Sequence, residues 1–419
     1  MQLSTLHQTT PISRFDRYCR QLLLQALAGA EYGTLILRDH EGEYRVEGRL
    51  NPTTLIAHIE VIDSTCYRHM VLGGSIGASE AYMTGDWVSL DLTDVIRFMS
   101  RNLQALKKWE AGPARLTRLL QRIYHWSNRN TEKGSRRNIA AHYDLGNDLF
   151  ECFLDPTMMY SSAIFPSTEN TLEEGSVAKL ERICRKLELK PGDEVIEIGT
   201  GWGGFAIHAA TRYGCRVTTT TLSQQQFEYA QAKVRALGLQ QQITLVMQDY
   251  RKLQGQYDKL VSIEMVEAVG HHYYPAYFET LGRLLKPEGL ALIQAITIDH
   301  ERYRQAIHNV DFIQRYIFPG SCIPSVTALL QACGDHSDLQ LTHMEDITPH
   351  YARTLREWRH NFLRHTDRIR TQGYSEEFIR MWEFYFCYCE GGFEERVIGD
   401  VQLLFAKPGF RGEPVLGAL

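Results

Sequence analysis

The stretch EVIEIGTGWGGF, residues 194–205, decides how the chain folds. Its first five residues predict a short buried strand, because three of them are β-branched and apolar. Glycines follow in the spacing G-x-G-x-G-G, and a helix is predicted from Gly203 to Arg212. Glycines in such a turn let a ligand approach the backbone closely. Open α/β sheets bind ligands at the carboxyl ends of their strands, so this turn is a candidate binding site.

On both sides of this stretch, predicted strands and helices alternate between about residues 176 and 298. Further strands are predicted at 216–221, 243–247, 257–263 and 290–298, and further helices at 177–187, 223–237 and 273–285. This alternation predicts an α/β fold with a mainly parallel, doubly wound sheet. Residues 300–395 are expected to be helical, and residues 402–405 to form a terminal strand.

The composition describes a globular chain of more than one domain. Its 419 residues are 44% hydrophobic and 23% charged, which excludes disorder, collagen and coiled coil as descriptions of the whole chain. No apolar run reaches the roughly 20 residues of a membrane span, and the first residues do not match a secretory signal. Nine cysteines without a C-x-x-C pair favour a cytoplasmic protein with reduced thiols. The sequence shows no metal-ligand spacing.

Three regions are predicted along the chain. They are a smaller α+β domain at 1–100, a basic amphipathic linker at 101–137 and the main α/β domain at 138–410. Within the first region, residues 33–38 and 44–48 are strand-like runs around an acidic turn, and residues 73–77 are loop-like.

The linker is strongly basic, although the formal net charge of the whole chain is -5. It contains ten Lys or Arg residues against two acids, and Arg115, Arg118 and Arg122 share one side of a predicted helix. This pattern favours binding to an anionic membrane surface, and the alternative is a solvated helix packed on a neighbour. Nucleic acid is disfavoured, because the rest of the chain is acidic and no reading motif accompanies the basic residues.

Two classes of cofactor compete for the glycine-rich turn. A dinucleotide site requires G-x-G-x-x-G and an acid about 20 residues further on. The next strand here ends in Thr221-Leu-Ser, without an acid. S-adenosylmethionine instead suits Glu197 on the first strand, the loop glycines up to Gly203, and Asp249, which could bind the adenine amine. Together with Lys286-Pro-Glu-Gly289, these residues favour S-adenosylmethionine.

Other motifs occur in a fixed order along the chain. They are His142-Tyr-Asp-Leu-Gly-Asn-Asp148, Met159-Tyr-Ser-Ser-Ala163, Gln248-Asp-Tyr-Arg251, Met265-Val-Glu-Ala-Val-Gly270, Tyr316-Ile-Phe-Pro319 and His350-Tyr-Ala-Arg-Thr-Leu355. This set resembles the cyclopropane-fatty-acyl-phospholipid synthase family, which includes the mycolic acid cyclopropane synthases, over about residues 135–405. The stretch from Gly73 to Trp87 is similar to the smaller amino-terminal domain of the phospholipid-acting members.

The resemblance implies a Rossmann-like, S-adenosylmethionine-dependent methyltransferase fold with helical insertions that cover the lipid. The implied reaction methylates the cis double bond of an unsaturated fatty acyl chain in a membrane phospholipid and forms a cyclopropane fatty acid. The expected form is a homodimer, peripherally associated with an anionic phospholipid bilayer at the inner membrane face. By motif, the cofactor is expected to contact Tyr160, Ser161, Gly199, Gly201, Thr221, Gln226, Asp249 and Tyr250.

The chain departs from the family at the proton acceptor, which the resemblance implies to be a bicarbonate ion. Its holders match Glu267, Tyr351 and the backbone of Ile296, whereas Ser162 stands for a cysteine and Gln294 for a histidine. Both replacements are neutral, and Gln294 cannot become a cation. Three outcomes stay open. The ion still binds, Glu267 takes the proton, or a different proton is lost and the product is a methyl-branched or methylene fatty acid or a furan fatty acid precursor.

Two other classes of protein compete with this one. A non-catalytic lipid-binding protein is disfavoured by the intact glycine loop and by Glu267. A methyltransferase for a soluble substrate would leave residues 1–137 without a purpose. Retained cofactor binding would separate an enzyme from a lipid binder, and dependence on liposomes would separate a lipid substrate from a soluble one.

Overall fold

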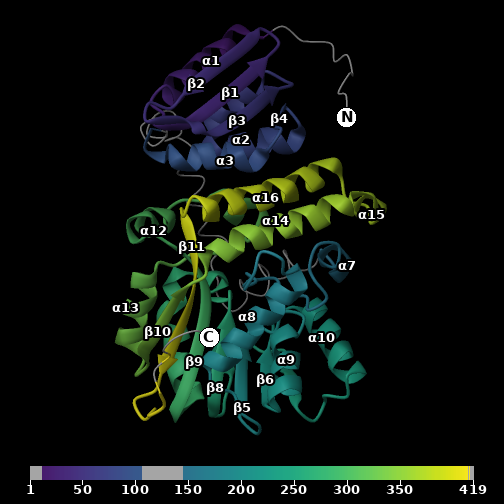
Figure 1. Cartoon of the computed structure of the whole chain (residues 1–419), viewed down its shortest axis with the longest axis vertical. Helices are drawn as coiled ribbons and strands as arrows, with labels where there is room; N and C mark the ends of the chain where they lie inside the picture. Colours follow the sequence, from purple (N-terminus) through teal and green to yellow (C-terminus); the bar gives the residue numbers. More distant parts are fainter. Residues whose placement is uncertain (1–11, 106–144, 414, 416–419) are drawn as a thin grey trace. The chain divides into compact units, whose positions relative to one another are not determined.

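The computed structural model describes residues 12–105, 145–413 and 415, which fall into two compact units (Figure 1). The described residues 12–105 and 366–395 form the first unit, and the others form the second. Residues 366–395, which the sequence assigned to the domain at 138–410, therefore pack with the amino-terminal part of the chain. The basic segment lies outside the described residues from 106 onward, so its amphipathic helix stays a prediction.

The first unit contains a four-stranded sheet with the strand order β2-β1-β3-β4. Its strands are β1 (Tyr32–Asp39), β2 (Gly42–Glu47), β3 (Asn51–Val61) and β4 (Trp87–Val88). β1 and β2 pair antiparallel across a tight turn, which confirms the two strand-like runs predicted there. β3 lies parallel to β1, and β4 pairs antiparallel with β3.

The helices described in this unit are α1 (Arg14–Leu27), α2 (Cys66–Thr84), α3 (Leu92–Arg101), α15 (Thr366–Thr371) and α16 (Glu376–Glu394). The stretch 73–77 lies inside α2, so the prediction of a loop there was wrong. The helix is interrupted only at Gly74, which has φ 60° and ψ -138°. Glycine adopts such a conformation without the steric cost of a Cβ, so the clustered glycines mark a kink within a helix.

Polar contacts as well as a buried aromatic face hold α16 within the first unit. The hydroxyl of Tyr82 donates to Glu383 Oε2 at 2.9 Å. Arg97 and Arg101 of α3 both pair with Glu395, at 2.8 and 2.6 Å. These partners lie between 294 and 301 residues apart in the chain, so helical periodicity could not show which unit α16 joins.

The second unit contains a seven-stranded sheet with the order β10-β11-β9-β8-β5-β6-β7. Its strands are β5 (Glu194–Ile198), β6 (Arg216–Thr220), β7 (Ile243–Val246), β8 (Tyr257–Ile263), β9 (Leu285–Ile298), β10 (Gln340–Asp346) and β11 (Ile398–Ala406). β5 to β9 pair in parallel, whereas β11 and β10 add antiparallel. The predicted doubly wound sheet is confirmed. The prediction of helix throughout 300–395 missed β10, whose exposed edge position leaves little apolar signal.

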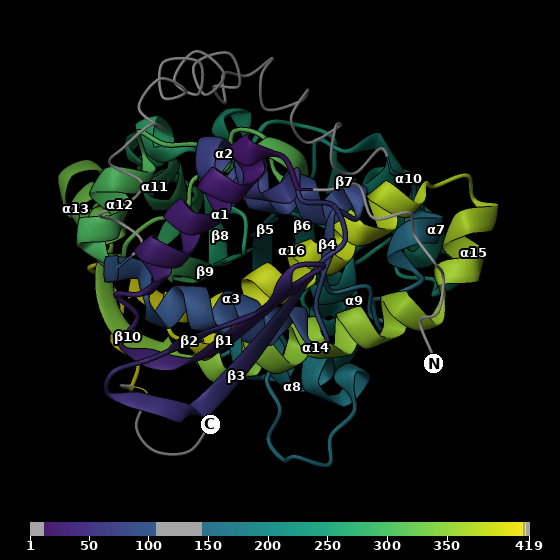
Figure 2. The same cartoon turned by 90° about the horizontal axis from the view of Figure 1, so that it is seen from above.

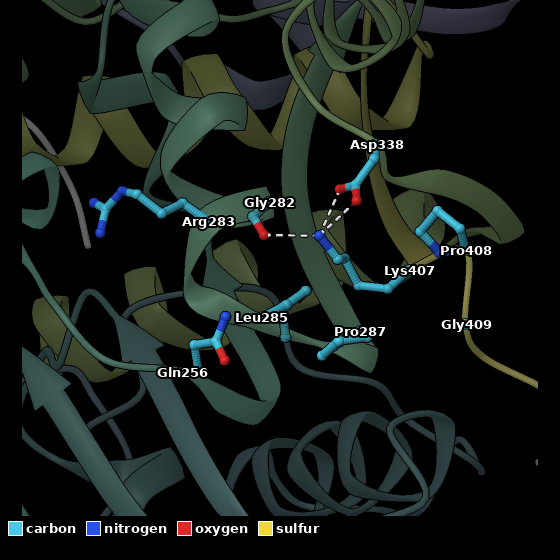
Figure 3. A pocket seen from close by; sticks show the side chains of 9 residues that line it. All are labelled: Gln256, Gly282, Arg283, Leu285, Pro287, Asp338, Lys407, Pro408 and Gly409. Carbon is cyan, nitrogen blue, oxygen red and sulfur yellow. Dashed lines mark hydrogen bonds and ion pairs between the residues drawn. The ribbon is translucent and has the colours of Figure 1, made fainter.

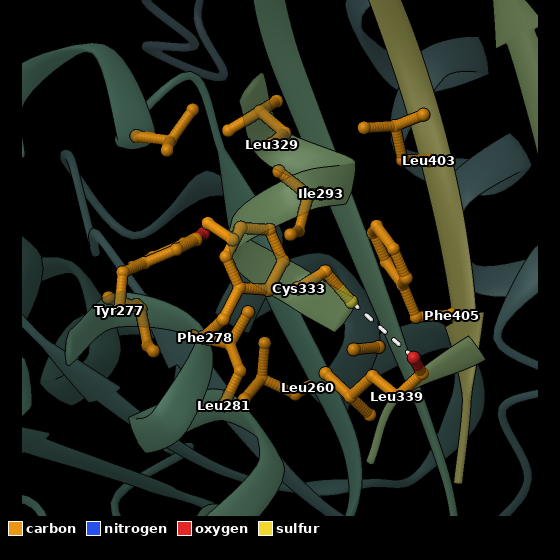
Figure 4. Close-up of a cluster of buried hydrophobic side chains, with 14 of the residues drawn as sticks. Leu260, Tyr277, Phe278, Leu281, Ile293, Leu329, Cys333, Leu339, Leu403 and Phe405 are labelled. Carbon is orange, nitrogen blue, oxygen red and sulfur yellow. Dashed lines mark hydrogen bonds between the residues drawn. The ribbon is translucent and has the colours of Figure 1, made fainter. Parts of the chain in front are cut away.

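Helices cover both faces of this sheet (Figure 2). The α-helices described in this unit are α7 (Asn147–Phe150), α8 (Leu172–Lys186), α9 (Gly204–Tyr213), α10 (Gln224–Ala236), α11 (Tyr274–Leu284), α12 (His300–Ala306), α13 (Val326–His336) and α14 (Thr348–Arg364). One core cluster joins α8, α9 and α10 to the sheet, and a second joins α11 and α13 to the other face. Figure 4 shows the second cluster, in which Phe278 and Leu281 of α11 meet Leu329 of α13 and Ile293 of β9. Packing on both faces holds the sheet in place, and the candidate site lies at the carboxyl ends of its parallel strands.

Within the described ranges, no helix is both long and apolar enough to cross a membrane.

Candidate active site

The glycine loop joins β5 to α9 and adopts a backbone that suits glycine. Gly199, Gly201 and Gly203 have φ of 102°, 52° and 89°. A Cβ on Gly199 would lie 3.3 Å from Met265 Cγ, so the loop is tightly packed at that point. At Gly201, in contrast, the described residues beyond its chain neighbours place no atom within 4 Å of where a Cβ would be. The loop therefore presents bare backbone to open space, and this cradle fits S-adenosylmethionine.

Two further predicted cofactor residues meet where β6 ends. The hydroxyl of Thr221 donates to Gln226 Oε1 at 3.0 Å, and the backbone N–H of Ser223 donates to the same hydroxyl at 3.1 Å. Ser223 also caps α10, as predicted, by accepting from the backbone N–H of Gln226. Thr221 and Gln226 are thus held side by side at the edge of the sheet that carries the glycine loop. Neutral groups that both donate and accept suit ribose hydroxyls.

Asp249 and Tyr250 follow β7 at the same edge of the sheet. Arg251 binds both carboxylate oxygens of Asp249, through Nε at 2.8 Å and Nη2 at 2.5 Å. Its guanidinium also lies 5.6 Å from the centre of the Tyr250 ring. Burial alone would raise the pKa of Asp249, but the hydrogen bonds from Arg251 lower it. The sequence analysis did not single out Arg251, and an adenine amine would have to share Asp249 with it.

Tyr160 and Ser161 lie between an aromatic cluster and a buried lysine. The Tyr160 ring lies 5.2 Å from the ring of Trp358 and 5.3 Å from that of Phe150. Ser161 Oγ accepts from Lys179 Nζ at 2.8 Å. Burial lowers the pKa of Lys179 to about 8, although nearby carboxylates oppose the shift. Aromatic faces of this kind attract a cation, which suits a substrate that gains positive charge during the reaction.

Glu197 makes its hydrogen bond within the sheet. Its Oε2 accepts from the hydroxyl of Thr219 at 2.6 Å, and Thr219 lies 2.6 Å from Thr200 Oγ1. Burial raises the pKa of Glu197 to about 8, against the opposing effects of Thr219 and Lys179. These contacts join β5 to β6. A contact between Glu197 and the cofactor stays a prediction.

Glu267 lies in a short 3-10 turn, Val266–Ala268, that follows β8. Its Oε1 accepts from the backbone N–H of Ile296 at 2.5 Å, so the structure brings these two predicted residues together. Its Oε2 is buried and finds no hydrogen-bond donor within the described part of the chain. Burial, and after it the charge of Glu264, raises the pKa of Glu267 to about 8.

The other three predicted catalytic residues all contact Glu264, which the sequence analysis did not single out. The backbone N–H of Ser162 and the amide of Gln294 each donate to Glu264 Oε1 at 2.8 Å. The hydroxyl of Tyr351 donates to Glu264 Oε2 at 2.6 Å. The hydroxyl of Ser162 donates to the carbonyl oxygen of Ala163 at 2.9 Å. The residues chosen to hold an anion therefore hold a carboxylate of the protein itself.

The backbone of Glu264 is in the left-handed region, with φ 47°. For a residue with a Cβ this conformation costs about 1–2 kcal/mol. Glu264 is a half-buried residue, whereas Gln294 is fully buried. Desolvation raises the pKa of Glu264, and its three donors and Lys179 oppose the shift. The signal that could have found Glu264 is its place, directly after the buried strand 257–263 at the ligand-binding edge of the sheet.

A buried relay of amides and a lysine extends from Glu264. Gln402 Nε2 donates to Gln294 Oε1 at 3.0 Å, and Lys186 Nζ donates to Gln402 Oε1 at 2.8 Å. Gln294 also donates to Asp400 Oδ2 at 3.3 Å. Burial, followed by the charge of Glu264, raises the pKa of Asp400 well above its usual value, which favours the protonated acid. Nothing in the sequence placed these residues together, because they come from three separate elements.

A cavity of about 430 Å³ lies at the opposite edge of the sheet (Figure 3). Gln256 precedes β8 and Leu285 begins β9, so the cavity opens at the amino ends of these strands. Inside it, Lys407 Nζ donates to the carbonyl oxygen of Gly282 at 3.0 Å and pairs with Asp338 at 2.6 Å. None of the predicted site residues lines this cavity, so it is separate from the candidate active site.

The parallel sheet and the cradle of the glycine loop place the second unit among the S-adenosylmethionine-dependent methyltransferases. A family model described as mycolic acid cyclopropane synthetase matches residues 130–403, and the chain belongs to this family.

Named relatives and solved structures agree with this assignment. The chain is 38% identical to tuberculostearic acid methyltransferase UfaA1 of Mycobacterium tuberculosis over 354 residues, 80% of each chain. It is 37% identical to the cyclopropane-fatty-acyl-phospholipid synthase of Escherichia coli over 354 residues, 84% of this chain and 88% of that one. The structure of the cyclopropane synthase MmaA2 from Mycobacterium tuberculosis superimposes with a TM-score of 0.61 at 30% identity, over 65% of this chain and 98% of that one.

Proposed function

We propose that this protein transfers a methyl group from S-adenosylmethionine to the cis double bond of an unsaturated acyl chain in a membrane phospholipid, and that a cyclopropane ring then closes. The observation that carries the proposal is the carboxyl centre of Glu264 and Glu267, which follows β8 where Met265 packs on the glycine loop. Such a centre stabilises positive charge and can accept a proton, and ring closure needs both. Two relatives named for lipid methylation or cyclopropane formation support it.

The site residues would bind the cofactor and stabilise a cation on the acyl chain. When bound, S-adenosylmethionine supplies an electrophilic methyl group that adds to the double bond and leaves a cation on the acyl chain. The glycine loop, Thr221 and Gln226 would hold the cofactor. The faces of Tyr160 and Trp358 and the charge of the carboxyl centre would stabilise the cation. Packing of the buried aromatic cluster around the centre would exclude water, which would otherwise trap the cation.

A second candidate reaction is methylation without ring closure. The relative of 38% identity is named a tuberculostearic acid methyltransferase, and a 34% identical relative from Pseudomonas putida is named a probable fatty acid methyltransferase. The neutral residues Ser162 and Gln294 also favour this outcome, because they change the surroundings of the proton acceptor. The product would then be a methyl-branched or methylene fatty acid, or a precursor of a furan fatty acid.

We further propose that the protein acts as a homodimer at the inner face of a membrane, with the anionic bilayer as its partner. The contact with the bilayer is supported by the sequence of the segment 101–137, which combines a basic side with an apolar side, and the homodimer is what the family resemblance implies. Binding of the protein to vesicles with and without anionic lipid tests the membrane contact. Equal binding to both kinds of vesicle would contradict it.

A product assay separates the two reactions. The protein is incubated with vesicles of cis-unsaturated phospholipid and S-adenosylmethionine that carries a trideuterated methyl group, and the acyl esters are analysed by mass spectrometry and proton NMR. Cyclopropane formation predicts a product that keeps two deuterons and shows upfield ring protons. An alkene that keeps all three deuterons, or a methylene group that keeps two without upfield ring protons, would replace the proposal with methylation without ring closure. Absence of any deuterated lipid, with S-adenosylmethionine bound, would refute both.

A further inference from the structure

We propose that Glu264 is the proton acceptor of the reaction and that its carboxylate takes the place of a dissolved anion. This inference rests on the proposed function. Three residues that the family resemblance assigned to an anion site donate to this side chain, at 2.6 to 2.8 Å. The donors are the backbone of Ser162, the amide of Gln294 and the hydroxyl of Tyr351. Burial raises the pKa of Glu264, and the three converging donors oppose this shift and favour the ionised form, which is the form that accepts a proton.

A dissolved anion would compete with Glu264 for the same donors. It would also lie next to the carboxylate of Glu264, and like charges repel strongly away from water. The arrangement therefore leaves neither donors nor a favourable potential for bicarbonate.

The relay behind Gln294 fixes which way its amide faces. The ammonium of Lys186 can only donate, so Gln402 must turn its oxygen toward Lys186 and its N–H toward Gln294. Gln294 must then accept with its oxygen and present its own N–H to Glu264. Lys186 is thus a positioning residue, which acts on the proton acceptor through two amides.

The backbone conformation of Glu264 also marks a functional position. The left-handed φ of 47° is strained for a residue with a Cβ, and such strain gathers at functional sites. Glu264 keeps part of its surface exposed, whereas Gln294 behind it has none. The next residue, Met265, packs against Gly199 of the glycine loop, which brings the carboxylate to the cofactor end of the site.

Ring closure breaks one C–H bond of the newly added methyl group. The electron pair of that bond forms the C–C bond that closes the ring and neutralises the cation on the chain. The proton passes to a carboxylate oxygen of Glu264 as a new O–H bond, and it leaves to solvent once the product has gone.

The experiment compares the full-length wild type with E264Q and E264G in buffer depleted of bicarbonate and in the same buffer with bicarbonate or formate added. Wild-type turnover is expected to be the same in all three. E264Q should lose about 100-fold or more of its turnover, the usual contribution of a positioned base, while calorimetry shows unchanged binding of S-adenosylmethionine. E264G should recover activity with added bicarbonate or formate, because glycine accepts this backbone and leaves the three donors free for a small anion.

E188Q is the matched control. Glu188 is also a glutamate in the left-handed region, with φ 52°, but it is exposed and outside the carboxyl centre. The turnover of E188Q should equal that of the wild type. Loss of wild-type activity on removal of bicarbonate would overturn this inference alone, as would an E264Q variant of normal turnover. Absence of methylated lipid from the wild type in every buffer would instead overturn the proposed function, and this inference with it.

Discussion

Replacement of Lys186 by Met tests the relay without touching the carboxyl centre. Lys186 is fully buried, and its Nζ donates to Gln402 at 2.8 Å and to Glu345 at 2.5 Å. Methionine has a similar length and is apolar, so it should fill the same space. Glu345 keeps the Nε donor of Arg182 at 2.7 Å. The one polar atom that loses its donor is therefore the oxygen of Gln402.

The magnitude follows from the orientation of the two amides. Without Lys186, Gln402 and Gln294 can both turn over, and Gln294 can present an oxygen instead of an N–H to Glu264. A hydrogen bond to a charged group contributes about 1.5–3 kcal/mol. At about 1.4 kcal/mol for each factor of ten, complete loss of the hydrogen bond from Gln294 to Glu264 would lower the catalytic rate by about 10- to 100-fold. We expect a decrease of about tenfold, because the amides rotate in only part of the molecules.

The assay measures initial rates of methyl transfer to phospholipid vesicles between about pH 6 and 9, with binding of S-adenosylmethionine as a separate readout. Loss of a donor raises the pKa of Glu264, so more of this carboxyl is protonated at a given pH. The deficit of K186M should therefore be largest at low pH and shrink as the pH rises, at unchanged cofactor affinity. R185M on the same helix is the control, because that arginine is exposed and pairs with Glu181. A K186M variant with the rate and pH profile of the wild type would refute the relay.

Three further predictions follow from single residues. E267Q should abolish lipid methylation while calorimetry still detects bound S-adenosylmethionine. Normal turnover of E267Q would contradict a catalytic role of Glu267. G199A should weaken cofactor binding at least tenfold in the same calorimetric assay, because a φ of 102° and Met265 at 3.3 Å both oppose a Cβ. Burial raises the pKa of Glu197 from 4.5 to about 8, so the folded state binds the extra proton and stability should fall as the pH rises from about 5 to about 8. In thermal melts, the stability of E197Q should depend less on pH over this range than that of the wild type. An equally steep decrease in stability would contradict the raised pKa of Glu197.

Much of the second unit could be predicted from the sequence, because its signals are local. The strand at 194–198, the glycine loop and the Ser223 cap each depend on residues within one short segment. Residue type alone indicates the backbone conformation at such positions. Glycines occupy three left-handed positions, and β-branched residues occupy the parallel strands. The family motifs then added residue roles that no periodicity could supply.

The misses share a different physical origin. The glycines at 73–77 permit a loop and a helix kink equally, and only packing decides between them. β10 is an exposed edge strand without an alternating apolar pattern, so its sequence resembles that of a polar helix surface. α16 has an apolar face that could pack on either unit, and contacts such as that of Tyr82 with Glu383 settle the choice.

The carboxyl centre shows most clearly why positions matched by motif do not define a site. Matching found the donors Ser162, Gln294 and Tyr351, because each aligns with a residue that performs a known task in relatives. It could not find their acceptor, because Glu264 fills the position where those relatives are expected to bind an ion. A substitution pattern that looked like a weakened anion site, with a serine and a glutamine as neutral replacements, is better explained by an anion built into the chain. Neutral donors then suffice, since Glu264 is covalently held and needs no extra positive charge to remain bound.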